Sequence, residues 1–404
     1  MAKASTRDSA NNLSRGTNQS GVRLYNERLV LSLVRRHGSL PKAELARRTG
    51  LSPQTISTIA NALEADGLLL RLNPLRGKVG QPLVPYSLNS RGAFFLGLKI
   101  GRRSSDVVLL DFAGAVLARI HQPHPYPTPE LIVALAQRGI DELPQALSSD
   151  ERVRIAGFGI ASPFELWNWA AQIAAPNEVL KAWKESDIQR EIAKISPWTV
   201  YFHNDGTAAC AAELVLGNGQ HGDDFLYIFI GSFLGGGVVL NGHLFPGRTG
   251  YGGAIGPLPV PAGNGKYQQL LGSASIYLLA EKLLAAGQDP SVLWLDPGSW
   301  GDLGEPLAEW IHQAAQSLAL AAVSAVSIID FRSVVIDGAF PTAVRSALVE
   351  ATREALGQFD LQGLAPFDIA EGTIGFRARE IGGACLPLLA NFTQDREVLF
   401  KENH

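Results

Sequence analysis

The stretch FFLGLKIGRRSSDVVLLDFAGAVLARIHQP, residues 94–123, decides the fold class of most of this chain. Three apolar segments are separated in it by a Gly-Arg-Arg turn and an Ala-Gly turn, which predicts three consecutive antiparallel strands. A long amphipathic helix (PELIVALAQRGIDELPQAL, 129–147) and a buried strand (VRIAGFGIAS, 153–162) follow. The stretch therefore opens an α/β unit in which a strand meander is continued by a helix and a further strand.

The same order of elements returns later in the chain. HNDGTAACAAELVLGNG (203–219) follows the apolar strand WTVYF (198–202). DDFLYIFIGSFLGGGVVLNGHLF (223–245) is then interpreted as a strand over 226–231, a turn at glycines 235–237 and a return strand over 238–245. Two such units predict a duplicated actin-like, ribonuclease-H-like body with a cleft between its lobes. Such folds place anions between two strand hairpins, where backbone N–H groups point at them.

Composition is that of an ordinary soluble globular protein, with 46% hydrophobic and 18% charged residues among 404. No apolar run approaches the roughly 20 residues of a membrane-spanning helix, and no signal peptide is evident at the N-terminus, so we expect a cytoplasmic protein without membrane partners. Cys210 and Cys385 have neither disulfide-framework nor zinc-site spacing, and we expect both to be buried.

Charge is divided unequally along the chain. Residues 1–90 contain 13 Lys and Arg against 5 Asp and Glu, whereas residues 91–404 contain 22 against 33. A basic N-terminal part on an acidic body predicts that the first part binds a polyanion and the second does not.

Residues 1–20 are polar and aperiodic and predict a flexible arm. Three short helices are expected next, in YNERLVLSLVRRHG (25–38), PKAELARRTG (41–50) and SPQTISTIANALEADG (52–67). Two strands, LLLRLN (68–73) and LVPYSLN (83–89), then flank the basic loop PLRGKVGQP. This order predicts a winged helix-turn-helix over residues 21–90.

The candidate DNA contacts are cations for phosphates and short polar side chains for bases. They are Arg47, Arg48, Ser52, Gln54, Thr55, Ser57, Thr58, Arg76 and Lys78. The alternative is a three-helix protein-interaction module with a solvated basic face.

From residue 22 to the end, the order of motifs resembles the ROK family (repressors, open reading frames and kinases), specifically its regulator branch, in which a winged helix precedes a sugar-kinase-like (ASKHA) body. The motifs that carry the resemblance are GLKIGRRSSDVVLLDFAGAVL, APNEVLKAW, HNDGTAACAAELVLGNG, IGSFLGGGVVLNGHLFPGRTGYGGAIG, VVIDGAF and EIGGAC. Together they are specific, although each Gly-rich piece alone is weak.

The phosphate motif of the family's kinases, D-x-G-G-T-K, is altered here. Lys99 stands in place of the Asp, Arg102 of the second Gly, and Arg103-Ser104 of the Thr-Lys pair. Lys99 reverses the charge where a magnesium partner would sit, and Arg102 brings a side chain into a turn that needs none. Because phosphoryl transfer depends on positioning and charge neutralisation, we expect no enzyme activity. The alternative is that these cations hold phosphates by charge alone.

The resemblance also implies a nucleotide site and a zinc site, and both are altered. Phe233 occupies the second hairpin where the family has a smaller residue, and VVIDGAF keeps one glycine, Gly338, so we do not expect ATP binding. The family's zinc ligands, one His and three Cys, are replaced by Pro257, Ala262, Asn264 and Gln269. We therefore expect no metal and no cofactor.

Sugar hydroxyls in the family are bound by six groups, of which this chain keeps Asn177, Asn204 and Asp205. Ala254, Pro257 and Leu271 replace the other three, so an ordinary hexose should bind weakly. The cleft is therefore expected to bind a different, less hydroxylated ligand, or none. The effector site that the resemblance implies consists of Asn177, Asn204, Asp205, Gly253 and Ala254, with Asp205 as a relic of the catalytic base. Trp167, Trp169 and Trp183 are expected near the cleft mouth, where they could stack on a ring, although the more common role of aromatic residues is plain packing.

The leading hypothesis is a ROK-type repressor of carbohydrate-related genes, a homodimer or tetramer that binds a two-fold DNA operator and a sugar or sugar-derived effector. Its expected parts are the arm (1–20), the winged helix (21–90), a smaller lobe (93–203 with about 385–404), and a larger lobe (204–384) for effector binding and oligomerisation. Two alternatives stay open. One is an active ROK sugar kinase with an appended DNA-binding domain, which the retention of Asp205 favours. The other is a regulator controlled by a protein partner.

Overall fold

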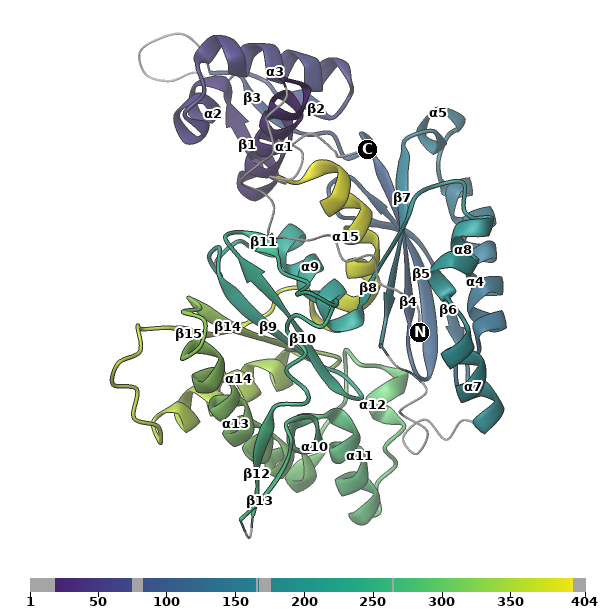
Figure 1. Ribbon diagram of the computed structural model, residues 1–404, viewed down its shortest axis with the longest axis vertical. Helices are drawn as coiled ribbons and strands as arrows, with labels where there is room; N and C mark the ends of the chain where they lie inside the picture. Colours follow the sequence, from purple (N-terminus) through teal and green to yellow (C-terminus); the bar gives the residue numbers. More distant parts are fainter. Residues whose placement is uncertain (1–18, 75–82, 165, 167–175, 264, 395–404) are drawn as a thin grey trace. The chain divides into compact units, whose positions relative to one another are not determined.

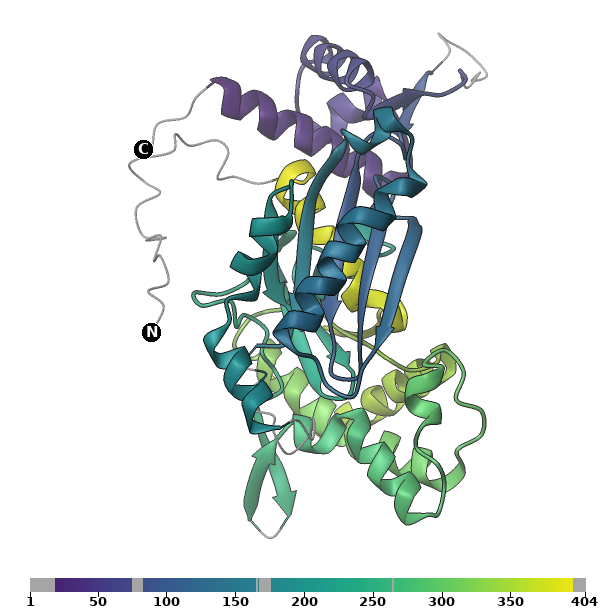
Figure 2. The same ribbon diagram turned by 90° about the vertical axis from the view of Figure 1, so that its right-hand side faces the viewer.

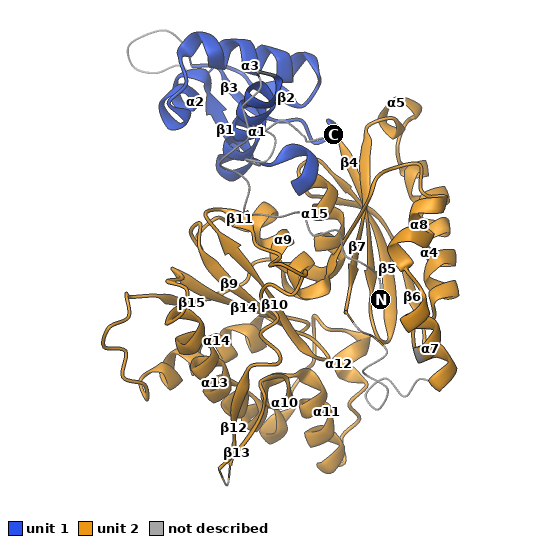
Figure 3. Cartoon of the chain, in the orientation of Figure 1, with its two compact units in different colours: residues 1–92, 389–404 blue, residues 93–388 orange. Residues whose placement is uncertain are grey.

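The computed structural model describes residues 19–74, 83–164, 166, 176–263 and 265–394 (Figure 1). The chain forms two compact units, one of residues 1–92 with 389–404 and the other of residues 93–388 (Figure 3). Residues 389–404 were expected in the smaller lobe of the body, but they group with the N-terminal unit. One reason is a hydrogen bond in that unit, from the Gln394 amide to the Tyr25 hydroxyl. Among the described residues, no helix is both long and apolar enough to cross a membrane.

The N-terminal unit has the winged-helix architecture. Its elements are α1 (Gln19–His37), β1 (Ser39–Pro41), α2 (Lys42–Thr49), α3 (Pro53–Ala65), β2 (Leu69–Arg71) and β3 (Pro85–Leu88). Gly50 ends α2 in the left-handed conformation, and the Ser52 hydroxyl caps α3 by accepting from Thr55 N. The three helices and the two wing strands confirm the prediction. Strand β1, which pairs with β3, was not predicted, and α1 begins two residues inside the expected arm.

The first sheet of the body follows the predicted meander. Its strands are β4 (Phe94–Ile100), β5 (Ser104–Asp111), β6 (Val116–Pro123), β7 (Ile155–Ser162) and β8 (Val200–Asn204), in the order β6-β5-β4-β7-β8. The first three strands are antiparallel, and β7 and β8 continue the sheet in parallel. Helices α4 (Pro129–Glu142) and α8 (Ile188–Ile195) lie on one face of this sheet (Figure 2). Their apolar side chains belong to the core of this lobe. The described part of this lobe also contains α5 (Ser149–Arg152), α7 (Asn177–Glu185) and the 3-10 helix η2 (Leu143–Ala146).

The second sheet repeats this topology. Its strands are β9 (Phe225–Ile230), β10 (Leu234–Leu240), β11 (His243–Leu244), β14 (Ser333–Gly338) and β15 (Asp368–Glu371), in the order β11-β10-β9-β14-β15. Again a three-stranded antiparallel meander is extended by two parallel strands. The predicted duplication is therefore confirmed.

Helices and a hairpin complete this lobe. They are the hairpin β12 (Pro259–Gly263) and β13 (Lys266–Gln269), then α10 (Leu271–Ala274), α11 (Ile276–Ala285), α12 (Val292–Leu295), α13 (Gly304–Val326) and α14 (Thr342–Leu356). Side chains of α11, α13 and α14 pack with the second sheet into one apolar core.

Two helices, α9 (Asp205–Leu216) and α15 (Ala378–Phe392), pack tightly against the sheets. A Cβ added to Gly159 of β7 would lie 1.9 Å from the carbonyl oxygen of Gly383 in α15, and one on Gly382 would lie 1.9 Å from the carbonyl oxygen of Ala208 in α9. Only glycine allows these backbones to approach so closely. The EIGGAC motif thus lets α15 contact both the first sheet and α9, and Cys210 and Cys385 are buried there, as expected.

The predicted turn at glycines 235–237 is wrong. These glycines lie inside β10, and the chain turns at Gly231, Ser232 and Phe233 instead. Two of them are needed because neighbouring groups lie against the strand: a Cβ on Gly236 would lie 2.4 Å from the Tyr227 carbonyl oxygen, and one on Gly237 would lie 2.4 Å from Cys210 Cβ of α9. The expected return strand over 238–245 is also interrupted, because Asn241 and Gly242 have φ of 54° and 73° and form the turn into β11.

Candidate functional site

The first candidate site is the exposed face of α3. Gln54, Thr58 and Asn61 are all exposed and recur at the spacing of one helical face, opposite the buried Ile56, Ile59, Ala60 and Leu63. The Thr58 hydroxyl donates to the Gln54 backbone carbonyl oxygen, whereas the Gln54 side chain is exposed. Gln and Asn amides are suited to pairing with adenine edges.

Besides Thr58, three predicted base-reading residues have hydrogen bonds within the winged helix. Ser52 and Thr55 form the cap of α3, with 2.8 Å between their hydroxyl oxygens. Ser57 is half-buried and accepts from Lys42 Nζ at 3.1 Å, and the same ammonium donates to Asn61 Oδ1 at 2.8 Å. The sequence interpretation missed Lys42 and Asn61. Asn61 was recognisable from its position seven residues after Gln54.

Arg47 and Arg48, the predicted phosphate contacts on α2, both pair with Glu44. Arg48 Nε lies 2.6 Å from Glu44 Oε1, and Arg47 Nε lies 2.8 Å from Glu44 Oε2. These hydrogen bonds lower the pKa of the Glu44 carboxyl to about 2. One carboxylate therefore offsets part of the charge of two arginines. Arg76 and Lys78, the predicted wing contacts, lie outside the described residues.

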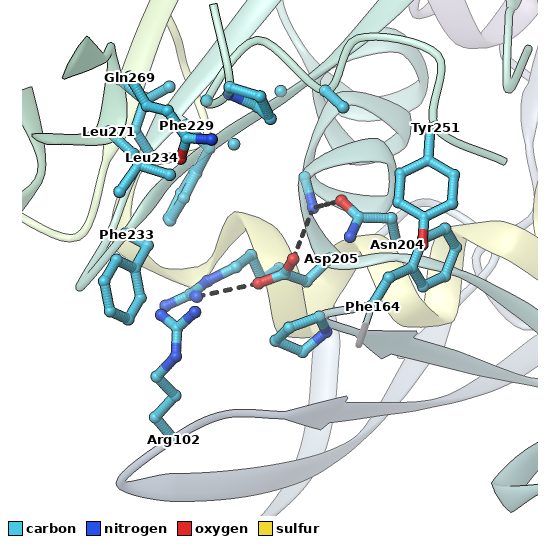
Figure 4. Close-up of a pocket in the computed structure, with 18 residues that line it drawn as sticks. Arg102, Phe164, Asn204, Asp205, Phe229, Phe233, Leu234, Tyr251, Gln269 and Leu271 are labelled. Atoms are coloured by element: carbon cyan, nitrogen blue, oxygen red, sulfur yellow. Dashed lines mark hydrogen bonds and ion pairs between the residues drawn. The ribbon is translucent and has the colours of Figure 1, made fainter. Parts of the chain in front are cut away.

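The second candidate site is a pocket of about 450 Å³ in the body, shown in Figure 4. Its polar lining comes from Arg102, Asn204, Asp205, Gln269 and Arg379. Its aromatic lining comes from Phe164, Phe229, Phe233 and Tyr251. The rest of its described lining is glycine or apolar: Pro163, Gly206, Leu234, Gly235, Gly236, Ala254, Gly256, Pro257 and Leu271. A mostly apolar pocket with a few polar groups is typical of a small-molecule site.

Asn204 and Asp205 lie in the pocket wall where β8 ends and α9 begins, as predicted. The Asn204 side-chain oxygen accepts from Gly206 N at 3.0 Å and caps α9. Asp205 Oδ1 accepts from the same N–H at 3.1 Å, and Asp205 Oδ2 accepts from Arg379 Nη1 at 3.1 Å. Both carboxylate oxygens of Asp205 therefore already accept hydrogen bonds within the protein.

The tips of the two β-hairpins meet at the pocket. Arg102 lies in the β4–β5 turn and Phe233 in the β9–β10 turn, and the guanidinium carbon of Arg102 is 3.4 Å from the Phe233 ring centroid. Burial lowers the pKa of Arg102 to about 9; the Asp205 charge opposes this shift and the Arg379 charge adds to it. The guanidinium remains charged at neutral pH.

The three cations of the altered phosphate motif do not converge. Lys99 Nζ pairs with Asp106 Oδ2 at 2.9 Å, and the guanidinium carbon of Arg103 lies 5.2 Å from the Trp294 ring centroid. Only Arg102 of the three lines the pocket.

Some of the other residues expected at the effector and zinc positions line the pocket, and others lie away from it. Ala254 lines the pocket, as do Pro257, Leu271 and Gln269. Gly253 precedes Ala254 at φ 78°, with no room for a Cβ beside Gly237, and so shapes the wall from behind. Asn177 is exposed at the start of α7 and is not among the described lining residues. Ala262 and Gln269 lie in the β12–β13 hairpin, and Asn264 lies outside the described residues.

The stacking prediction for Trp183 is wrong. Its ring is buried in the core of the first lobe, and its indole N–H donates to the Pro127 carbonyl oxygen at 2.9 Å. Trp167 and Trp169 lie outside the described residues. The aromatic residues of the pocket are instead Phe164 and Tyr251, whose rings meet edge to face at 4.8 Å, with Phe229 and Phe233. Of these four, the sequence interpretation had singled out only Phe233; no residue spacing marks Phe164, Phe229 or Tyr251 as pocket residues.

Comparison with known proteins agrees with this architecture. Residues 95–268 match the ROK family, and residues 23–69 match the winged helix-turn-helix DNA-binding family. A segment that matches a ROK domain thus follows one that matches a winged helix-turn-helix. The protein y4fQ of Sinorhizobium fredii is 26% identical over 91% of each chain. The xylose repressor of Bacillus subtilis is 22% identical over 60% of this chain and 62% of its own length, so this match spans less than two thirds of the repressor.

Solved ROK structures share the fold. A ROK family transcriptional regulator described as a homologue of the Escherichia coli MLC protein superposes with a TM-score of 0.63 at 20% identity, covering 92% of this chain and 97% of its own. The ROK hexokinase of Thermus thermophilus superposes with a TM-score of 0.53 at 25% identity, covering 73% of this chain and 98% of its own. The ROK fold thus occurs in both a regulator and a kinase, and the site residues must distinguish them.

Proposed function

We propose that this chain is a DNA-binding transcriptional repressor of the ROK type, whose kinase-like body binds a sugar-related effector and transfers no phosphoryl group. The observation that carries the proposal is the exposed Gln54, Thr58 and Asn61 face of α3 within a basic winged helix. The similarity to the xylose repressor supports both the regulatory role and the class of effector.

The hairpin tips argue against kinase activity. Arg102 and Phe233 stack on each other where the family's kinases would hold nucleotide phosphates between glycine-rich turns. A bulky pair there removes backbone N–H groups from reach of a phosphate. On the adenosine side, the Phe340 ring lies over Gly338, where an added Cβ would be 2.4 Å from the ring. We therefore propose that the body uses neither ATP nor, because its zinc-ligand positions carry no His or Cys, zinc.

Asp205 supports the kinase alternative by its position but not by its surroundings. A general base must be free to accept a proton from the substrate hydroxyl. Here, Arg379 and Gly206 donate to its two oxygens. We assign Asp205 to effector binding and to the positioning of Arg379.

Helix α15 offers a route by which the effector acts on DNA affinity. Arg379 near its start lines the pocket and pairs with Asp205. Residues from Leu389 onward belong to the N-terminal unit. We expect lobe closure around the effector to change the spacing of the two winged helices in a dimer, and so DNA affinity, by about 1–3 kcal/mol.

Selection from a random double-stranded DNA library, with the full-length protein immobilised, tests the function. We expect enrichment of a two-fold-symmetric sequence, since a symmetric dimer binds two half-sites. Fluorescence anisotropy on the selected duplex then measures affinity with and without sugars. A library that stays unenriched would contradict the DNA-binding function. Enrichment with no change in affinity upon addition of any sugar, but a change in a cell extract depleted of small molecules, would favour control by a protein partner.

A further inference from the structure

Lys42 lies beside the exposed face of α3 and contacts two residues of that helix. It is the first residue of α2, and its ammonium donates to Ser57 Oγ at 3.1 Å and to Asn61 Oδ1 at 2.8 Å. The same ammonium lies over the buried Tyr86 ring of β3, 5.4 Å from its centroid. Two hydrogen bonds and a cation–π contact therefore hold this side chain in place.

The contact with Lys42 fixes the orientation of the Asn61 amide. An ammonium has three donors and no acceptor, so the end of the amide that faces it must be the oxygen. The amide nitrogen is then directed away from Lys42, and no hydrogen bond among the described residues uses it. Asn61 therefore presents N–H donors at the exposed face of α3.

The charge of Lys42 is not offset by a carboxylate in the described part of the winged helix. Arg47 and Arg48, in the same helix, share Glu44. Lys42 instead donates to a hydroxyl and an amide oxygen, which are neutral groups. Two of its three N–H groups are used in this way, so a third donor and the whole charge remain for DNA.

We propose that Lys42 and Asn61 together read a guanine in the major groove. This inference rests on the proposed function, in which α3 binds DNA. Guanine presents two acceptors, N7 and O6, on one edge, whereas adenine presents N7 beside the N6 donor. Two neighbouring donors match guanine. The N6 amino group of adenine would meet an amide oxygen that already accepts from a cation.

Gln54 provides a comparison on the same helix face. Its side chain is exposed, and no hydrogen bond in the described part of the chain uses its amide. Both ends of this amide are free to pair with N6 and N7 of adenine. Two amides on one face are thus expected to read different bases, because Lys42 contacts only Asn61 of the two.

Base analogues in the selected duplex test the inference on the full-length wild type. Adenine, 7-deazaguanine and hypoxanthine would replace each guanine of the half-site in turn, with Kd measured by fluorescence anisotropy. Hypoxanthine keeps N7 and O6 and should bind within twofold of guanine. At one guanine, adenine and 7-deazaguanine should each weaken binding about tenfold or more. Asn61→Ala should lose the discrimination at that same position.

Lys42→Met removes the charge and the donors and keeps a side chain of similar length. We expect its preference for guanine over adenine at that position to fall at least tenfold, because Asn61 Oδ1 is then free to accept from adenine N6. A residue that only contacts phosphate would weaken both duplexes equally when replaced. An unchanged guanine preference in Lys42→Met would therefore overturn the inference.

Two further variants complete the test. Lys42→Arg keeps the charge and the donors and should still prefer guanine. Arg71→Met, which removes another cation that lies over Tyr86, is the matched control and should leave every base preference as in the wild type. If Lys42→Met proves unstable, the base analogues on the wild type still decide. A half-site in which no guanine responds to 7-deazaguanine overturns the inference and leaves the DNA-binding function standing, whereas an unenriched library overturns the function itself.

Discussion

Arg102 and Phe233 stack at 3.4 Å across the two hairpin tips of the body. The hairpins belong to different sheets, at matching positions of the duplicated topology, so this pair joins the two lobes. A cation on a buried aromatic face is worth about 2 kcal/mol. The two turns that would bind nucleotide phosphates in a kinase are thus in contact with each other through Arg102 and Phe233.

The first prediction concerns catalysis. Incubated with magnesium, ATP and a hexose panel, the wild type should release ADP at the rate of the protein-free control, and Asp205→Asn should not change that rate. The Arg102–Phe233 stack is the physical reason, because it occupies the phosphate turn. Turnover that disappears in Asp205→Asn would identify an active kinase.

Glu44 supplies the second prediction. Its carboxylate holds Arg47 and Arg48, so Glu44→Gln should release both guanidinium groups toward phosphates. We expect affinity for any duplex to rise roughly threefold to tenfold, with a steeper salt dependence, by counterion release. Anisotropy titrations from 50 to 300 mM salt measure both quantities. Glu142→Gln, which breaks the comparable Arg138 pair on α4, is the control, and weaker DNA binding by Glu44→Gln would mean that Glu44 positions the arginines.

The third prediction is a dependence of stability on acid pH. Burial alone would raise the pKa of Asp106, but the Lys99 charge and the His121 hydrogen bond, with Arg119, lower it to about 2 from 3.8. A depressed carboxyl pKa stabilises the folded state above pH 3.8, and this stability is lost as the pH falls toward 2. The stabilisation is about 2 kcal/mol.

Asp106→Asn should accordingly lower the free energy of unfolding by about 2–3 kcal/mol at pH 7, because it leaves the cations of this cluster without their buried partner. The difference in free energy of unfolding between Asp106→Asn and the wild type should shrink below pH 3. Urea unfolding of both proteins at each pH measures this difference. Asp141→Asn, on the exposed face of α4, should stay within about 0.5 kcal/mol of the wild type. A difference between Asp106→Asn and wild type that is the same at pH 7 and pH 3 would refute the assignment.

Gly159 gives the fourth prediction. Its Cβ position lies 1.9 Å from the Gly383 carbonyl oxygen, so Gly159→Ala must push α15 away from β7. We expect a loss of about 3 kcal/mol or failure to fold, as for a severely overpacked core. Gly272→Ala, whose Cβ would meet nothing closer than 3.5 Å, is the control and should unfold like the wild type. Equal stability of the two variants would show that α15 does not pack as described.

Sequence patterns predicted the architecture well and the pocket only in part. The strand meanders, the helix-turn-helix and the position of Asn204 and Asp205 follow from local periodicity and chain order, which tertiary contacts did not override. Glycines 235–237 were misassigned because a glycine run is typical of a turn, whereas here Gly236 lies against the Tyr227 carbonyl oxygen and Gly237 against Cys210 of α9, inside a strand.

Residues brought together from distant segments were not predictable. Arg379 reaches the pocket from a helix 174 residues beyond Asp205, and no spacing marks this pairing. For Trp183, the sequence left ring stacking and plain packing open, and the structure shows packing, since Trp183 is a core residue whose indole N–H donates to the Pro127 carbonyl oxygen. Asn177 follows the family motif, but its position at the start of α7 is exposed.

The most direct test of the account is the specificity ratio of the full-length protein, the Kd for a scrambled duplex divided by the Kd for the selected duplex. We predict a ratio of at least about 1,000 at physiological salt. Gln54→Ala and Asn61→Ala should each lower it by about tenfold to a hundredfold, since a side chain that reads a base contributes about 1–3 kcal/mol of discrimination. Arg138→Gln, on the body, should leave it unchanged. A wild-type ratio near one would contradict the account, because the winged helix would then bind DNA by charge alone.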